Sequence, residues 1–236
     1  MGNGMNKVLP GLYLGSFRDG KDSEQLQSNK ITHIISIHDT AKEVVEDKEY
    51  LCIRVPDSPD ENLSKYFPKC NDFIHNARLS GGNVLIHCLA GVSRSATITA
   101  AYIMSVTSLT LKDALKVVRG ARNIANPNYG FHSQLKEFES FVLTSERKRL
   151  KIRYPNSDQE KDEEECAKMI TVYHSNASTL APQTLDPKAS TSYSASSTPV
   201  TSPMHRFKQR KSRSASSSPR RSTSHTEKLD SPRRKS

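Results

Sequence analysis

The segment from residue 83 to residue 106 constrains the fold of this chain more than any other part. It reads NVLIHCLAGVSRSATITAAYIMSV, and its short apolar beginning ends at Cys88. Short apolar runs bounded by turn residues are typical of buried strands. The end of the segment is small or apolar on every face, as in a helix enclosed by the rest of a domain. The segment therefore predicts a buried strand, a tight loop from Leu89 to Ser93, and a buried helix.

Other segments of the first 155 residues alternate between the same two patterns. Apolar runs of strand length lie at residues 11–17, 33–39 and 50–55. Helical patterns lie at residues 23–29, 65–79, 111–122 and 129–150. Strands that alternate with helices predict an α/β domain, with a central, mostly parallel sheet flanked by helices.

The loop between the strand and the buried helix suits a bound anion. The first turn of a helix carries unpaired backbone N–H groups and a partial positive charge, which together attract phosphate. Gly91 allows the loop backbone to turn its amides inward. Amides, the helix and Arg94 would lower the pKa of the Cys88 thiol and make it a nucleophilic thiolate. The planar guanidinium of Arg94 can hold two phosphate oxygens.

An isolated cysteine at the end of a strand is more often simply buried. Several features coincide here, however: the strand, His87, a short loop with a glycine, Arg94, and the hydroxyl of Ser95 at the start of the helix. Their coincidence favours Cys88 as a nucleophile.

A phosphate ester also needs an acid that protonates the leaving oxygen, on a loop that can close over the phosphate. The segment RVPDSPDENLS offers Asp57, Asp60 and Glu61. From the residues alone all three remain open, and Asp57 could instead cap the following helix.

The stretch HCLAGVSRSA resembles the C-x-x-x-x-x-R signature of cysteine-dependent protein phosphatases, in the version found in the dual-specificity group. The segments VLPGLYLG, THIISIHD, AYIM and NPNYGF are similar to segments of the small atypical members of that group. The resemblance implies the cysteine-dependent phosphatase fold and a catalytic domain at residues 1–155. Residues 156–236, rich in Ser, Arg and Pro, are expected to form a disordered basic tail.

The resemblance implies a role for each site residue. Cys88 attacks phosphorus and forms a cysteinyl phosphate. Asp57, which aligns with the family's acid, protonates the leaving oxygen and then activates water, and Ser95 donates to the departing sulfur. The phosphate-binding residues are Leu89, Ala90, Gly91, Val92, Ser93 and Arg94. No metal or other cofactor is expected.

Two further residues have supporting roles in the family pattern. His87 orients the loop, and Asn128 braces the active-site loops. A packed structural histidine and an ordinary helix start are equally good interpretations of these two residues. The family's tyrosine-specific members have Trp-Pro-Asp where this chain has Val55-Pro56-Asp57. The difference implies a shallow pocket that admits phosphoserine and phosphothreonine as well as phosphotyrosine.

The two ends of the chain indicate a membrane surface as a partner. Gly2 follows the initiator methionine and resembles a myristoylation signal, although Asn6 replaces the usual Ser or Thr. One myristoyl chain binds membranes weakly, so a second signal is needed. Residues 200–236 hold eleven basic and two acidic residues, a net of +9 out of +10 for the whole chain. Phosphorylation of this tail would weaken its attraction to lipid.

We expect phosphorylated proteins as substrates, with components of mitogen-activated kinase pathways as the candidates that the family suggests. The four cysteines show no metal-binding spacing. With neither a signal peptide nor an apolar run of membrane-spanning length, the sequence favours a cytoplasmic monomer, with the plasma membrane and the nucleus as further locations.

Two other functions remain as alternatives. The first is a phosphate-binding pseudoenzyme, and the presence of Cys88, Arg94 and Asp57 together argues against it. The second is an RNA-associated adaptor that acts through the Arg/Ser tail, but aromatic residues rarely interleave the basic ones, so no nucleic acid is expected. Phosphoinositide hydrolysis is disfavoured because the loop interior LAGVS has no lysine.

Overall fold

The computed structural model of this chain describes residues 4–179, and residues 1–3 and 180–236 lie outside the described part. The predictions for a lipid at Gly2 and for the basic tail beyond residue 179 therefore concern residues that the structure does not describe. Within residues 4–179, no helix has the length and apolar character needed to cross a membrane.

A five-stranded sheet forms the centre of the described domain, in the order β1-β2-β5-β3-β4. The last four of these strands run parallel, and β1 pairs antiparallel with β2 at one edge. The strands are β1 (Asn6–Leu9), β2 (Leu12–Ser16), β3 (Ile31–Ile37), β4 (Glu49–Ile53) and β5 (Asn83–Cys88). The predicted α/β fold with a mostly parallel sheet is confirmed. The sequence analysis missed β1, a short strand that forms through its hairpin with β2.

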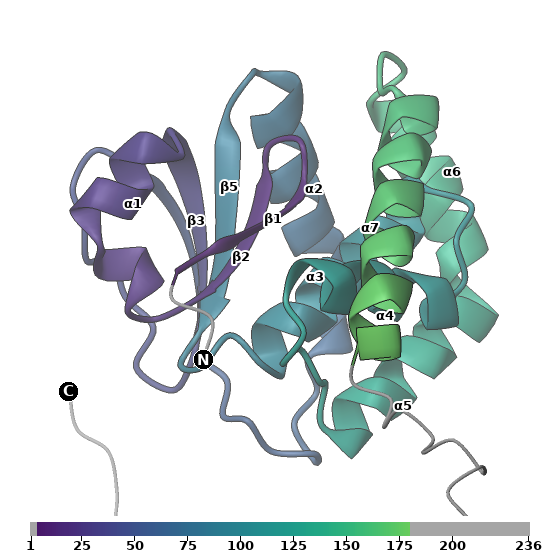
Figure 1. Ribbon diagram of the computed structural model, residues 1–236, viewed down its shortest axis with the longest axis horizontal. Helices are drawn as coiled ribbons and strands as arrows, with labels where there is room; N and C mark the ends of the chain where they lie inside the picture. Colours follow the sequence, from purple (N-terminus) through teal and green to yellow (C-terminus); the bar gives the residue numbers. More distant parts are fainter. Residues whose placement is uncertain (1–3, 180–236) are drawn as a thin grey trace, which may run out of the picture. The chain divides into compact units, whose positions relative to one another are not determined.

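Helices cover both faces of the sheet (Figure 1). They are α1 (Ser23–Ser28), α2 (Phe67–Leu79), α3 (Arg94–Val106), α4 (Leu111–Ala121), α5 (Tyr129–Glu137), α6 (Leu143–Arg153) and α7 (Gln159–Thr179), with 3-10 turns at Asp19–Lys21 and Ser64–Tyr66. α1 covers one face over a small cluster that contains Leu26, Ile34 and Leu85. The main core lies on the other face, beneath α2, α3 and α4.

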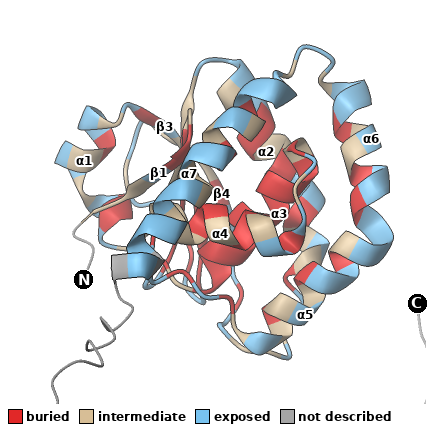
Figure 2. Cartoon of the chain, turned by 45° about the vertical axis from the view of Figure 1, so that its right-hand side comes forward, coloured by how far each residue is buried: buried red, intermediate tan, exposed pale blue. Residues whose placement is uncertain are grey.

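Helix α3 is the most enclosed helix of the domain, as its all-round apolar sequence predicts. Every residue from Arg94 to Ser105 is buried, and Figure 2 shows this helix in red behind its neighbours. Thr97, Thr99 and Ser105 donate their hydroxyls to carbonyl oxygens four residues earlier, as in the bond from Thr99 Oγ1 to the Ser95 carbonyl (2.8 Å). These three buried hydroxyls therefore need no water.

The predicted single helix at residues 129–150 is divided in the structure. Phe138–Val142 form a π-helical turn between α5 and α6. A π-helix brings residues five apart to nearly the same side. Phe138 and Leu143, five apart, are both buried, while Phe141 between them faces solvent. Core packing therefore interrupts the helix where the sequence pattern continues.

The predicted boundary at residue 155 leaves out α7, which packs on the rest of the described domain. A Cβ atom at Gly120 of α4 would collide with the backbone oxygen of Met169 in α7, so the two helices lie in close contact. Cys166 of α7 is fully buried, and Met169 and Ile170 pack against the core. These residues form an apolar stripe at helical spacing, which the surrounding acidic residues obscure in the sequence.

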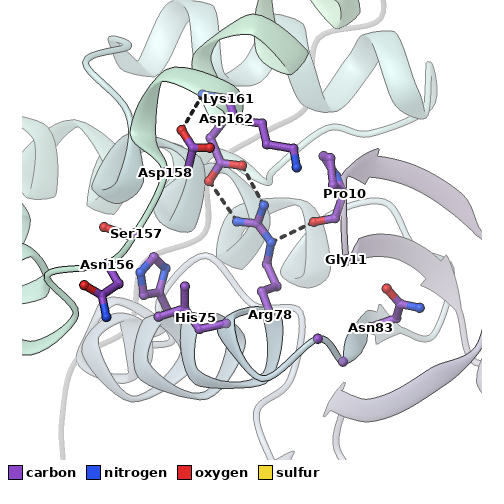
Figure 3. A pocket seen from close by; sticks show the side chains of 13 residues that line it. Pro10, Gly11, His75, Arg78, Asn83, Asn156, Ser157, Asp158, Lys161 and Asp162 are labelled. Atoms are coloured by element: carbon purple, nitrogen blue, oxygen red, sulfur yellow. Dashed lines mark hydrogen bonds and ion pairs between the residues drawn. The ribbon is translucent and has the colours of Figure 1, made fainter.

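Two acidic residues near the start of α7 bind residues of the catalytic domain. Asp162 binds Arg78 in the last turn of α2, with oxygen–nitrogen distances of 2.9 and 2.6 Å (Figure 3). Glu163 accepts a hydrogen bond from the Ser108 amide (2.8 Å). Two acidic residues thus fasten α7 to the catalytic domain.

Candidate active site

The candidate site lies at the carboxyl end of β5, where Cys88 is the last residue of the strand and Arg94 the first residue of α3. In open parallel sheets, ligands bind at this edge. Gly91, in the middle of the loop, has a φ of +70°, and a Cβ there would lie 2.5 Å from the Gly15 carbonyl oxygen. The loop thus requires glycine at this position for both its conformation and its packing against β2.

The carbonyl groups of the loop point away from its centre. The Leu89 oxygen accepts from the Phe17 amide (3.2 Å), and the Val92 oxygen accepts from the Asn126 amide (2.8 Å). Loop amides are left to face inward, and the Gly91 amide donates to Cys88 Sγ (3.2 Å). The backbone therefore forms the ring of donors that the sequence analysis expected around a bound anion.

Cys88 is buried at the bottom of this ring, and its sulfur also accepts from the Ser95 hydroxyl (3.2 Å). Burial opposes ionisation of the thiol and is the largest single influence on its pKa. The Ser95 hydroxyl and the amides of Ser95, Val92 and Gly91 together outweigh burial and hold the pKa below the ordinary value for cysteine. The site therefore favours a thiolate.

The other three cysteines differ from Cys88 in this respect. Burial raises the pKa of Cys52, Cys70 and Cys166, in the last case to about 12. Cys70 and Cys166 are buried as completely as Cys88, but they lack its donors. Burial alone thus produces an inert thiol, and the donors of the loop make the difference.

Arg94 is buried beside the loop and retains a free donor. One terminal nitrogen donates to the Val55 carbonyl (2.9 Å) and lies 3.3 Å from Asp39 Oδ1. Its Nε lies 3.5 Å from Asp57 Oδ2 but makes no hydrogen bond within the described part of the chain. A buried donor without a hydrogen bond is costly. The guanidinium is therefore fixed in place with a donor available to a phosphate oxygen.

Asp57 is the one of the three acidic candidates that reaches the loop. Its Oδ1 accepts from the Ser93 hydroxyl and from Asn128 Nδ2, both at 2.7 Å. Glu61 pairs with Lys65 at 4.0 Å instead, and Asp60 is exposed. The structure thus brings Asp57 together with Cys88 and Arg94.

Asn128 satisfies both interpretations that the sequence left open. Its Oδ1 accepts from the Phe131 amide (2.9 Å) and so caps the start of α5. Its Nδ2 holds Asp57, and its own amide donates to Ser93 Oγ (3.1 Å). One side chain therefore starts a helix and connects the acid loop with the phosphate loop.

His87 packs beneath the phosphate loop. Its ring lies 6.1 Å from both Phe17 and His38, centroid to centroid, and its Nδ1 lies 3.3 Å from the Cys88 carbonyl oxygen. Burial lowers its pKa to about 4, so the ring is neutral at physiological pH. A neutral ring in this position supports the loop backbone.

The sequence analysis missed two residues of this site. Asp39 follows β3, the strand next to β5, and the general rule that site residues gather at this edge of a sheet could have found it. Arg122 follows α4 and contacts the loop from behind. No local signal marks it in the sequence.

A cysteine with a lowered thiol pKa at the amino end of a buried helix, an arginine with a free donor and a carboxyl group on a facing loop together define a cysteine-dependent phosphatase. The family model described as "Dual specificity phosphatase, catalytic domain" matches residues 12–141. The chain belongs to the dual specificity phosphatase family, and it is a dual-specificity protein phosphatase. Its resemblance to the small atypical members is confirmed by the relatives.

Human dual specificity protein phosphatase 22 is 52% identical over 164 residues, which cover 70% of this chain and 89% of that protein. Mouse dual specificity protein phosphatase 15 is 52% identical over 154 residues, 65% of this chain and 66% of that protein. The crystal structure of DUSP15 matches with a TM-score of 0.64 and 51% identity, covering 66% of this chain and all of the other. These matches favour a phosphatase over the adaptor and pseudoenzyme alternatives.

Proposed function

We propose that this phosphatase hydrolyses phosphotyrosine, phosphoserine and phosphothreonine in proteins through a cysteinyl-phosphate intermediate on Cys88. The observation that carries the proposal is the contrast among the cysteines, since only the Cys88 thiol has a lowered pKa. This thiol also lies in the loop that meets Arg94 and Asp57.

In the first step, the Cys88 thiolate attacks phosphorus opposite the ester oxygen. A sulfur–phosphorus bond forms, the phosphorus–oxygen bond breaks, and the leaving oxygen takes a proton from the carboxylic acid of Asp57. Arg94 and the inward amides of residues 89–94 bind the three remaining oxygens as their charge redistributes. Amide and guanidinium donors that are already in place need no rearrangement when the phosphoryl group arrives.

In the second step, water attacks the phosphorus of the cysteinyl phosphate. Asp57, now a carboxylate, takes a proton from that water, and the sulfur–phosphorus bond breaks. The sulfur leaves as a thiolate, which the Ser95 hydroxyl stabilises from 3.2 Å. Inorganic phosphate is released and the site returns to its starting state.

The acid is positioned through one of its two oxygens. Ser93 and Asn128 hold Oδ1 of Asp57, while Oδ2 faces Arg94. Asp57 is one-third exposed at its side chain, so it lies where the pocket opens. The leaving oxygen of a phosphate bound at Arg94 would then lie within reach of the carboxyl group.

The test is hydrolysis of aryl phosphates by the full chain in the presence of EDTA. We expect Cys88→Ser to abolish turnover, and Cys52→Ser, which removes an exposed cysteine, to leave it unchanged. Asp57→Ala should slow turnover roughly 10²-fold or more for a poor leaving group and much less for a good one, because only a poor one needs the proton.

Three outcomes would contradict the proposal. Turnover by Cys88→Ser would exclude the covalent intermediate. An Asp57→Ala effect that is independent of the leaving group would exclude its role as acid. A wild-type chain that binds phosphopeptides through Arg94 without turning them over would be a reader of phosphate.

For the cellular setting, we propose that the enzyme acts as a monomer on phosphorylated components of kinase pathways at the cytoplasmic face of membranes. Support comes from the sequence of the two ends. Gly2 would carry the lipid, and residues 200–236, with a net charge of +9, would provide the second attachment to the membrane. Vesicles with and without anionic lipid test the idea. Binding should require both the myristoylated chain and anionic lipid, and should fall with added salt and with tail phosphorylation; binding indifferent to these changes would refute it.

A further inference from the structure

The two middle carbonyls of the phosphate loop depend on a single side chain. Leu89 and Val92 are held through backbone amides, as described above. Arg122, at the end of α4, instead donates from Nε to the Gly91 oxygen (2.9 Å) and from a terminal nitrogen to the Ala90 oxygen (3.2 Å). Arg122 is 5% exposed, so water does not replace these bonds readily.

The geometry of the peptide bond links these outward contacts to the inward donors. In a trans peptide, the C=O and the following N–H point in opposite directions, and the described part of this chain has no cis peptide. When Arg122 holds the Ala90 oxygen, the Gly91 amide must point to the other side, where it meets Cys88 Sγ at 3.2 Å. The Gly91 oxygen fixes the Val92 amide in the same way.

These two amides act on the nucleophile. Both Gly91 and Val92 amides lower the pKa of the Cys88 thiol. Within residues 4–179 no carboxylate pairs with Arg122, and its bonds go to uncharged oxygens. A buried charge without a counter-ion is unusual. Behind an anion-binding loop, it has the sign that favours a thiolate and a phosphate.

The other side of the guanidinium is fixed by the first residues of the described chain. A terminal nitrogen of Arg122 donates to Asn6 Oδ1 (2.7 Å) and to the Gly4 carbonyl (3.1 Å). Asn6 belongs to β1, the edge strand. The same residue is the one that departs from the myristoylation pattern at position 6, and its contact gives the amide side chain a separate reason to be there.

We propose that Arg122 is a positioning residue of this phosphatase, which turns the Gly91 and Val92 amides toward Cys88 and is itself held in place by Asn6. This inference rests on the proposed function, in which Cys88 is the nucleophile. It also couples the beginning of the chain to the site, since a displaced β1 releases one side of the guanidinium.

The test measures the loop directly as well as through turnover. The full chain carrying Cys52→Ser, which removes the exposed cysteine, is alkylated with iodoacetamide across a range of pH, and inhibition by inorganic phosphate is measured. In Arg122→Met, we expect alkylation to need a higher pH, phosphate to inhibit less, and kcat/KM to fall roughly 10- to 100-fold. Arg122→Lys, which keeps the charge but cannot serve both carbonyls, should recover part of the loss, and Asn6→Ala should show a smaller change in the same direction.

The matched control is Arg147→Met. Arg147 also holds two backbone oxygens, those of Met104 and Leu109, both at 2.9 Å, but far from the loop in sequence and on a different helix. The Arg147→Met substitution should lower the melting temperature while leaving the alkylation profile and phosphate inhibition unchanged.

An Arg122→Met chain that folds and keeps the wild-type alkylation profile and phosphate inhibition would overturn the proposal. If that variant does not fold, Arg122→Lys and Asn6→Ala decide, and wild-type profiles in both would overturn it equally. Failure of the proposed function is distinguishable, because it would appear as turnover by Cys88→Ser, whatever the Arg122 variants do.

Discussion

Two largely buried arginines at opposite ends of β5 are bound in opposite ways. Arg78 lies in the last turn of α2, near the start of β5, and each of its three nitrogens donates a hydrogen bond. It binds both oxygens of Asp162 at 2.6 and 2.9 Å, the Tyr102 hydroxyl at 2.8 Å and the Pro10 carbonyl at 2.8 Å (Figure 3). Arg94, at the other end of the strand, has longer contacts with its two carboxylates, 3.3 and 3.5 Å, and an Nε without a hydrogen bond.

This difference in hydrogen bonding indicates that Arg78 stabilises the fold, whereas Arg94 is available to bind a ligand. An arginine whose three nitrogens all have protein partners contributes to stability, and little of its binding capacity remains for a substrate. A buried arginine with an unused donor keeps part of its binding capacity for a phosphate. The missing hydrogen bond lowers the stability of the folded protein. The predictions below test this contrast, from the largest expected effect to the smallest.

Arg94→Lys should have the largest effect, and on catalysis alone. A lysine keeps the charge but cannot offer two donors in one plane, so we expect kcat/KM to fall roughly 10³-fold or more. The midpoint of urea unfolding should stay close to that of the wild type or rise slightly, because an unsatisfied donor is removed. A variant that loses stability and activity in parallel would show that Arg94 is a structural arginine like Arg78.

Arg78→Met should show the reverse. It leaves Asp162 without its partner in a buried position, which typically costs about 3–5 kcal/mol of unfolding free energy. Folded molecules should keep the wild-type kcat/KM, measured at a temperature well below the unfolding transition. Adding Asp162→Leu should restore much of the stability, because the uncompensated charge is then gone. No recovery in the double variant would mean that the ion pair itself, and not the stranded carboxylate, carries the effect.

The sequence predicts the active-site region around Arg94 far better than the region around Arg78. The phosphate loop is a local pattern, since a strand, a glycine, a cysteine and an arginine follow one another within a few residues, and its elements were predicted correctly. The partners that complete it come from distant segments: Asp39 from the turn after β3, Asn126 from the loop after α4, and Arg122 from the end of α4. The position of Asp39 after a strand is a signal, but nothing in the spacing of Asn126 and Arg122 indicates that they meet the loop.

The Arg78 cluster was missed entirely, for a physical reason. Its carboxylate lies on α7, a helix whose apolar stripe is masked by acidic neighbours, so composition assigned the segment to the tail. Whether Asp162 pairs with a basic residue nearby in sequence or with Arg78 is decided by how α7 packs on α4 through Gly120 and Met169. Packing of that kind is a property of the folded chain, and helical periodicity cannot supply it.

Asn128→Asp tests how Asp57 is positioned in the active site, whereas Arg94→Lys tests phosphate binding. Aspartate is as good an N-cap as asparagine, so the start of α5 should persist and stability should change little. The side chain, however, loses the donor that holds Asp57 at 2.7 Å and gains a charge that repels it. We expect kcat to fall about 10-fold for substrates with poor leaving groups. Asn128→Ala loses the cap as well, which should cost about 1 kcal/mol in addition. Full activity in Asn128→Asp would reduce Asn128 to a helix cap.

The smallest expected effect concerns pH at the Arg78 end. His75 is buried there, with Nδ1 2.9 Å from the Tyr102 hydroxyl and Nε2 unpartnered within the described residues. Burial first, and then the nearby Arg78, lower the pKa of His75, while the carboxylates of Asp162 and Asp72 oppose this shift. The Tyr102 hydroxyl accepts a hydrogen bond from Arg78, so its own O–H can donate to Nδ1 of His75. Nδ1 can accept this bond only when the imidazole ring of His75 is neutral.

The direction of the pH effect follows from this lowered pKa. Below a pH of about 6.5 the unfolded chain protonates His75, whereas the folded chain resists protonation until a lower pH is reached. The unfolded state therefore binds more protons in this window, and stability falls as pH falls through it. Urea unfolding between pH 7.5 and 5 should show a weaker pH dependence in His75→Gln than in the wild type, with any kcat/KM change unrelated to it. An equal pH dependence in both chains would mean that the saturated cluster around Arg78 is insensitive to its histidine, and that the acid sensitivity of the fold arises elsewhere, for instance at the buried His87 beneath the phosphate loop.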